Sequence, residues 1–234
     1  MHLLISPTKT MQAYSAGRSV PTSEHYLPIL LQCQKLTLNQ IKKFYKCNDS
    51  IAEKTLQNFQ NYSLRYTAIY AYSGLQYKYL NIQTLSDTAK EYLYANTSIL
   101  SALHGRVHPL NNIGEYRLDF SIPICIEKDS LYTYWHKQNI WNFDEQYVSL
   151  ASEEYFKMLP GALPVVQVLF YVLKNGKYLQ QATASKMTRG LFLRECALQN
   201  IQKIEELHKI TVNGFSFSQE KSNTQKLIFV KETT

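Results

Sequence analysis

The chain has 234 residues, of which 45% are hydrophobic and 18% charged, so it can bury a substantial core and is not a disordered polyelectrolyte. Its longest apolar run, residues 163–173, is interrupted by Gln167 and is about half the length of a membrane span, which argues against a transmembrane helix. The formal net charge is +7, with most of the excess in residues 1–117, and this charge suits a polyanionic partner without identifying it.

The N-terminus and the cysteines bear on the compartment. Residues 1–6 are too short and too soon interrupted to be the apolar core of a signal peptide, and they indicate a buried first strand. The cysteines are Cys33, Cys47, Cys125 and Cys196. Because none belongs to a C-x-x-C pair, we expect reduced, buried side chains in a soluble cytoplasmic protein. We expect no bound cofactor and a monomer.

The periodicity of apolar residues and the turn residues predict the elements in chain order. We expect a strand ending at 6–7, helical segments over 27–44 and from about 50, a strand over 68–72, and a helix from 87 to about 105. A strand over 116–120, a helix over 131–141 and a strand over 147–150 follow. Next come a hairpin of 163–173 with 178–183 around Asn175-Gly176, a long helix over 185–208, and paired strands 214–218 and 227–231. Strands and helices intermix without regular βαβ units, so we expect one α+β domain over 1–234, with a mixed sheet and surrounding helices.

Residues 147–157 are the most informative segment of the chain. A short apolar strand leads into Ser152 and the start of a helix that carries Glu154, Tyr155 and Lys157. One interpretation is structural, with a serine N-cap and acidic residues that complement the helix dipole. The other is a functional site in which Ser152, Glu154 and Tyr155 are candidate catalytic residues.

Three further segments have sequence features that bear on phosphate or metal binding. Residues 5–10, which include Lys9, lack the glycines of a phosphate-binding loop, but a lysine directly after a buried strand is a candidate functional residue as well as a solvated one. His104 and His108 are four residues apart, yet Gly105 and Pro109 disrupt the helix that chelation at this spacing needs, so we predict no metal site. Residues 100–108 resemble half of a helix-hairpin-helix turn, a motif whose backbone amides contact DNA phosphates.

Basic residues at the start of the long helix suggest an anion site. Lys186, Arg189 and Arg194 can cluster near the helix N-terminus, where cations oppose the helix dipole unless an anion lies between them and the helix amides. A solvated basic face is the alternative. In the strand expected over 116–120, Arg117 and Asp119 share one face, where they form either an exposed ion pair or part of a binding site.

Taken together, the short motifs resemble one protein family. They are Ile5-Ser6-Pro7-Thr8-Lys9-Thr10, Tyr72-Ser73-Gly74-Leu75, Leu103-His104-Gly105 through Pro109-Leu110, Glu115-Tyr116-Arg117-Leu118, Leu131 to Trp135, Leu150 to Lys157, Lys186 with Arg189-Gly190-Leu191, and Asn213-Gly214-Phe215. Their order and spacing are similar to those of the YaaA family of bacterial peroxide-stress-response proteins, over nearly the whole chain. The chain departs from the family pattern by lacking a Lys-Gly-Asp stretch before Tyr72, by having Val107-His108-Pro109 with Arg106 in place of Leu-Arg-Pro, and by having Ser149 in place of Asn.

The resemblance implies a single α+β domain with a basic cleft that binds double-stranded DNA, a helix-hairpin-helix element, and protection from hydrogen peroxide by limiting free intracellular iron. The candidate DNA- or anion-binding residues are Lys9, Arg106, Arg117, Lys157, Lys186, Arg189 and Arg194. An alternative function is an enzyme or a small-anion or nucleotide binder, whose pocket mixes Lys9, Ser152, Glu154 and Tyr155 with the basic residues. A carboxylate such as Glu154 at the centre of the site favours this alternative, because it repels phosphate.

Overall fold

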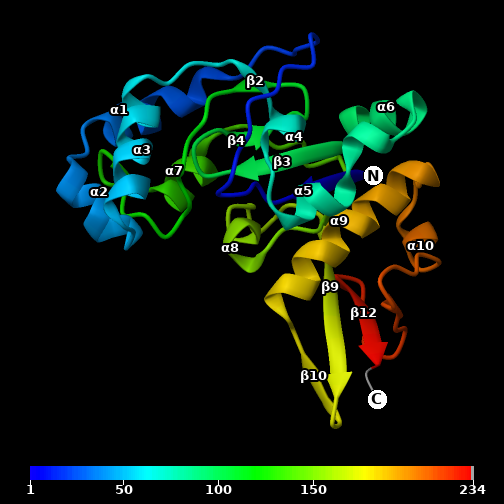
Figure 1. The fold of residues 1–234 in the computed structure, drawn as a ribbon. Helices are drawn as coiled ribbons and strands as arrows, with labels where there is room; N and C mark the ends of the chain where they lie inside the picture. The colour runs from blue at the N-terminus through cyan, green and yellow to red at the C-terminus, as the bar shows by residue number, and fades with distance from the viewer. Residues whose placement is uncertain (233–234) are drawn as a thin grey trace.

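A computed structural model describes residues 1–232 of the protein (Figure 1). The strands are β1 (His2–Ile5), β2 (Tyr66–Thr67), β3 (Thr97–Ser101), β4 (Gly105–Val107), β5 (Asn112–Ile113), β6 (Cys125–Ile126), β7 (Asp129–Ser130), β8 (Tyr147–Ser149), β9 (Val165–Lys174), β10 (Lys177–Leu179), β11 (Ser216–Phe217) and β12 (Lys226–Glu232). The α-helices are α1 (Leu27–Gln34), α2 (Leu38–Tyr45), α3 (Asp49–Gln60), α4 (Ala68–Ala71), α5 (Leu75–Leu80), α6 (Asp87–Asn96), α7 (Leu131–Lys137), α8 (Glu153–Phe156), α9 (Ala182–Leu198) and α10 (Ile204–Leu207). Two 3-10 helices, η1 (Glu24–Tyr26) and η2 (Ile82–Thr84), complete the set.

One mixed sheet organises the described chain, with strand order β11-β12-β9-β8-β1-β3-β4 and β10 paired to β9. Its centre is parallel, because β1 pairs in parallel with both β3 and β8, and β9 pairs in parallel with β8 and β12. The strands β4, β10 and β11 are antiparallel to their neighbours. The first strand is apolar and fully covered, which is the pattern of a central parallel strand. The predicted mixed sheet with surrounding helices is therefore confirmed.

The molecule is bent (Figure 1). On one side lie α1, α2, α3 and α7, and on the other an arm built from β9, β10, β12 and α9. The arm exists because β9 is long: its first residues pair with β8, whereas its last residues pair with β10. The short helix α8 lies in the angle between the two parts (Figure 1), and we call the face bordered by α7, α8 and the first turns of α9 the inner bend.

Local signals placed several elements correctly. Asn175 and Gly176 both have positive φ angles, 50° and 73°, as a two-residue turn between right-twisted strands requires, and the predicted β9–β10 hairpin is confirmed. The first strand, the short strand at 147–149 and the paired strands of the tail are also confirmed.

Other predicted elements were wrong because tertiary contacts decided them. Residues 68–71 form a helix and not a strand, since a short buried apolar run fits either structure. Residues 116–120 form no strand, and here the Phe120 amide donates to a glutamate side chain in place of a strand partner. The helix expected to continue to 105 ends at Asn96, after which β3 joins the parallel centre of the sheet.

The long helix expected to reach 208 ends at Leu198. Asn200 adopts φ 50°, and the Ile201 amide donates to the Cys196 carbonyl at 3.0 Å, which is the six-to-one bond of a Schellman stop. Among the cysteines, Cys33 and Cys196 are buried as expected, but Cys125 is exposed and Cys47 is half-buried.

Residues 100–108 do not form a helix-hairpin-helix element. They are the end of β3, a turn and β4, paired as an antiparallel hairpin. Gly105 lies inside the protein, where an added Cβ would collide with the ring of Trp135. The backbone of this turn is therefore not available to DNA phosphates, because a glycine amide must be reached from solvent to bind them.

Candidate functional site

The order of the strands creates a topological switch point between β1 and β8. These two strands are parallel neighbours, but the chain leaves β1 toward β3 on one side and leaves β8 toward β9 on the other. In open parallel sheets, ligands bind at such a switch point, outside the carboxyl ends of the strands. Ser6 follows β1 and Ser152 begins the turn into α8. The Ser152 amide donates to the Ser6 hydroxyl oxygen at 2.9 Å, so the two strand ends are joined at this point.

The loop after Ser6 brings Lys9 to the same edge. Thr8 accepts a hydrogen bond from the Gly74 amide at 3.2 Å, and the close approach requires glycine, because a Cβ at this position would collide with the Thr8 side chain. Lys9 then forms an ion pair with Asp119, with 2.6 Å between Nζ and Oδ2. The local ion pair of Arg117 with Asp119, one of the two alternatives for this segment, does not form, and the long-range pair with Lys9 takes its place. The sequence did not single out Asp119 as a site residue; the available signal was a carboxylate between the apolar residues Leu118 and Phe120.

Two carboxyl groups with different proton affinities meet at this edge. Glu154 accepts a hydrogen bond from the Phe120 amide at 3.0 Å. Burial, followed by the charge of Asp119, raises the pKa of Glu154 above its ordinary value. Burial opposes ionisation of Asp119 too, but hydrogen bonds from Lys9 and Ser121 outweigh it and lower its pKa. Asp119 therefore loses its proton more readily than Glu154, and of the two carboxyl groups Glu154 keeps its proton to the higher pH.

Aromatic rings form the wall behind the carboxyl groups. Phe120 stacks on Tyr132 with 4.3 Å between ring centroids and meets the edge of Tyr155 at 5.5 Å. The Tyr132 hydroxyl donates to the Glu154 carbonyl at 2.8 Å, which fixes the start of α8. Burial raises the pKa of Tyr155 far above its ordinary value, so this phenol is neutral and serves as a wall or hydrogen-bonding group, not as a base.

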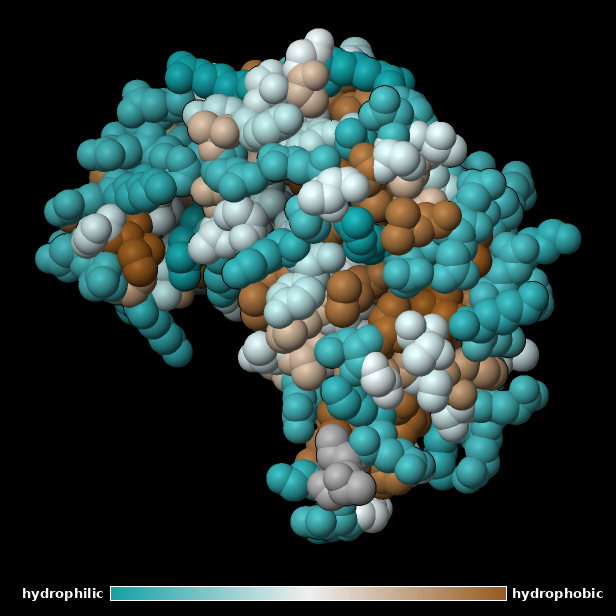
Figure 2. All heavy atoms as spheres, turned by 45° about the vertical axis from the view of Figure 1, so that its right-hand side comes forward, coloured by the Kyte–Doolittle hydropathy of each residue, from teal (hydrophilic) through white to brown (hydrophobic). Residues whose placement is uncertain are grey.

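The remaining basic candidates fall into three groups, of which the first has no side-chain partners in the described chain. Lys157, Lys186 and Arg117 form no ion pair or hydrogen bond through their side chains with any described residue, and both lysines are exposed. Lys157 ends α8 and Lys186 lies in the second turn of α9, so both belong to elements that border the inner bend (Figure 1). Figure 2 shows that the outline remains hollowed there when all atoms are drawn, and that the part of the molecule to its left is largely hydrophilic.

Arg189 is a half-buried cation without a counterion among residues 1–232. It lies on the same face of α9 as the buried residues Ser185 and Phe192, one helical turn away from each. Its Nε is buried without a hydrogen-bond acceptor among residues 1–232. Burial lowers its pKa to about 10, so the guanidinium is still charged at pH 7. An unpaired buried charge is costly, and an anionic ligand would remove that cost.

Two predicted binding residues lie elsewhere and have structural partners. Arg106 donates to Ser98 at 3.0 Å and to the Tyr147 hydroxyl at 2.9 Å, and it pairs with Glu145 at 3.2 Å. This network lies at the amino end of β1, the opposite edge of the sheet from Lys9. Arg194 donates to carbonyls at the C-terminal end of α5 and so caps that helix.

Residues 1–232 contain neither a cluster of metal-ligating side chains nor a membrane-spanning helix. Three or more His, Cys, Asp or Glu side chains do not gather anywhere in this range in a way that could hold a metal ion. Of the helices in the same range, none is both long and apolar enough to cross a bilayer.

Comparison with known proteins gives one consistent result. The family model described as peroxide stress protein YaaA matches residues 1–221. A UPF0246 protein of Finegoldia magna is 31% identical, over 99% of this chain and 98% of that protein. A UPF0246 protein of Lactobacillus delbrueckii subsp. bulgaricus is 32% identical over 99% of this chain and 100% of its own length. A UPF0246 protein of Ligilactobacillus salivarius is 30% identical over the same shares of the two chains.

Proposed function

Because this chain belongs to the family of YaaA peroxide stress proteins, we propose that it acts in the hydrogen peroxide response by binding duplex DNA without sequence preference on the inner bend. The observation that carries this proposal is the pair of free lysines, Lys157 and Lys186, on two elements that border a hollowed face. Phosphates attract such unpaired cations regardless of base sequence. The net charge of +7 adds a general attraction for polyanions.

The test is fluorescence anisotropy with a random duplex at several salt concentrations. If about four phosphates are neutralised, the affinity falls roughly a hundredfold between 50 and 200 mM salt. Replacing both Lys157 and Lys186 with Gln should weaken binding and reduce the slope of log K against log salt by about 1.8, because two phosphate contacts are lost. The matched control is Lys203→Gln with Lys209→Gln, two exposed lysines that flank α10 outside the inner bend. Salt-independent binding, or equal losses in both double variants, would rule the proposal out.

The cellular part of the proposal is protection from peroxide through a lower level of free iron, as the family resemblance implies. A strain without this protein should then be more sensitive to hydrogen peroxide and should hold more chelatable iron. Reintroducing the wild-type chain should restore both properties, whereas the Lys157 and Lys186 double variant should restore neither if DNA binding is required. Normal survival and unaltered iron in the deletion strain would contradict this role.

A second candidate function is a small-anion or nucleotide site, with or without catalysis, at the β1–β8 switch point. The observation that favours it is the convergence of Lys9, Asp119 and Glu154 there. Arg189, whose Nε has no acceptor among residues 1–232, is a further cation for an anionic ligand. Glu154 would donate a proton and Arg189 would hold the anion. Inorganic phosphate should then raise the melting temperature of the wild type and not of Arg189→Met. An unchanged melting temperature in saturating phosphate would exclude this function for phosphate-like ligands.

A further inference from the structure

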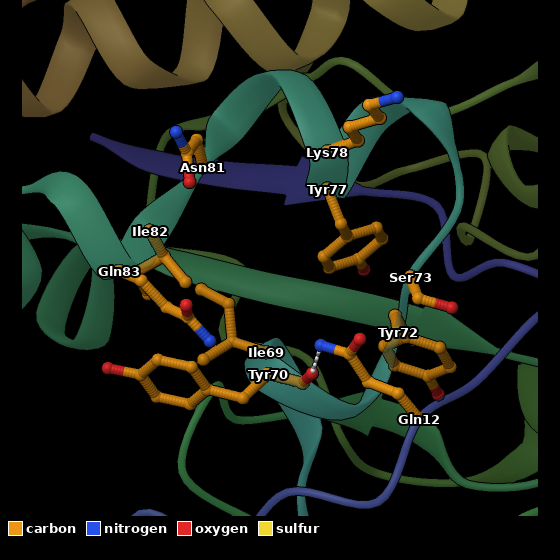
Figure 3. A pocket seen from close by; sticks show the side chains of 10 residues that line it. All are labelled: Gln12, Ile69, Tyr70, Tyr72, Ser73, Tyr77, Lys78, Asn81, Ile82 and Gln83. Carbon is orange, nitrogen blue, oxygen red and sulfur yellow. Dashed lines mark hydrogen bonds between the residues drawn. The ribbon is translucent and has the colours of Figure 1, made fainter.

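A separate cavity lies beside α4 and α5 (Figure 3). Its volume is about 360 Å³, within the usual range for small-molecule sites. Its floor is apolar: Ile69, Tyr72, Tyr77 and Ile82 are at most 6% exposed. The Tyr77 hydroxyl donates to the Ser6 carbonyl at 3.0 Å. The polar end of Tyr77 is therefore bound to the residue that follows β1, and its ring is left to line the cavity.

The rim of the cavity carries polar side chains. Figure 3 shows the carboxamides of Gln12 and Gln83 facing the cavity from opposite sides. Gln12 uses one amide hydrogen on the Tyr70 carbonyl, at 2.9 Å, and keeps its oxygen and second hydrogen. The Gln83 side chain makes no hydrogen bond with any residue of the described chain. Lys78 also belongs to the lining, but its ammonium group points away from the cavity (Figure 3).

We propose that this cavity binds a neutral nucleobase, which lies against the Tyr72 and Tyr77 floor while Gln12 and Gln83 hydrogen-bond to its edges. The Tyr72 and Tyr77 rings, tilted by 41° to each other, offer apolar surface to a heterocycle, and a carboxamide offers the donor and acceptor pair that matches a base edge. Lys78, the lining residue that carries a charge, points away from the cavity, so the interior of the cavity suits a neutral ligand better than a phosphate. This site is independent of the proposed DNA contacts on the inner bend, because those depend on phosphate charge.

The test titrates the full-length protein with adenosine, guanosine, cytidine and uridine, and follows the side-chain amide resonances of its Gln and Asn residues by NMR. At least one nucleoside should shift the Gln12 and Gln83 amides. Its dissociation constant should change less than about twofold between 50 and 200 mM salt, because no ion pair is involved. Gln83→Ala should weaken binding about three- to tenfold through the loss of its hydrogen bonds.

The matched control is Gln60→Ala, which removes another exposed glutamine whose side chain has no partner in the described structure and should leave binding unchanged. A base can arrive as a free nucleoside or from a DNA strand. Competition by a short single-stranded oligonucleotide would support the site and identify DNA as the source, and unaltered nucleoside binding would support the free ligand. If no nucleoside shifts these amides at millimolar concentration, or if both glutamine variants behave alike, the cavity is not a base site. Salt-sensitive duplex binding would survive that result, so the two proposals fail separately.

Discussion

The ion pair between Lys9 and Asp119 joins an exposed cation to a buried anion. The Lys9 side chain is 59% exposed, whereas that of Asp119 is 6% exposed. Lys9→Met keeps the unbranched side chain, one atom shorter, and removes its charge. Asp119 then retains its hydrogen bonds from Ser121 but loses the cation that balances it beside Glu154. The change therefore tests whether the stability of the protein depends on this ion pair at the β1–β8 switch point.

We expect Lys9→Met to lower the free energy of unfolding at pH 7 by about 2 kcal/mol. Losing a charge-assisted hydrogen bond to a buried carboxylate costs about 1.5–3 kcal/mol. The cost stays below the 3–5 kcal/mol or so of a fully buried pair, because water can replace the exposed Lys9 ammonium. A surface pair in which both partners are solvated contributes less than about 1 kcal/mol.

The pH dependence gives the sharper test of the same change. In the wild type the pKa of Asp119 lies below its ordinary value of 3.8, so its stabilising contribution is present above 3.8 and is lost as pH falls through the lowered value. In Lys9→Met, burial acts without the opposing hydrogen bond and charge of the lysine, so the pKa of Asp119 is higher than in the wild type and this carboxyl is protonated at a higher pH. The difference in stability between the two proteins should therefore be largest at pH 7 and shrink below about pH 4.

Urea denaturation at pH 7, 5 and 3.5 measures these differences, with Lys137→Met as the matched control. Lys137 has a similar exposure, 62%, and a similar ion-pair distance to Asp129, 2.6 Å, but its partner is more exposed, at 27%. The control should lose less than about 1 kcal/mol. If Lys9→Met loses no more free energy of unfolding than Lys137→Met, or if its loss is the same at every pH, Asp119 does not depend on Lys9 for its charge balance.

Three further outcomes follow from the packing and the burial of charge. In Gly190→Ala, the new Cβ would collide with the backbone carbonyl oxygen of Gln76 and should destabilise the protein by about 2–3 kcal/mol. Gly161→Ala, whose Cβ would have open space, should change the melting temperature little. Equal melting temperatures of the two variants would contradict the close contact of α5 and α9. Arg194→Met should cost about 1–3 kcal/mol in urea denaturation by leaving the end of α5 uncapped, while DNA affinity in anisotropy stays unchanged; a loss of affinity without a loss of stability would instead make it a binding residue. Burial lowers the pKa of His104 from 6.5 to about 3, so the unfolded chain takes up a proton first and the stability falls as the pH drops below 6.5. Between pH 7 and 5, His104→Phe should therefore lose about 2 kcal/mol less free energy of unfolding than the wild type. Parallel losses in the two proteins would refute this assignment.

The sequence by itself determined the features that depend on near neighbours. The buried first strand follows from a short apolar run, and the β9–β10 hairpin follows from Asn175-Gly176, whose positive φ angles only a few residue types tolerate. The sequence also predicted the start of α8 at Ser152 and contained the ordered family motifs, because each of these features depends on a few adjacent residues.

The tertiary structure alone decided which distant groups meet. Asp119 pairs with Lys9 and not with its near neighbour Arg117, because the strand order brings the loop after β1 against this segment. Arg106 and Arg194 are basic like the other candidates, yet the fold uses both to satisfy buried or terminal polar groups. Charge and periodicity describe one segment at a time, whereas a buried charge takes whichever partner the packing of remote segments places within hydrogen-bonding distance.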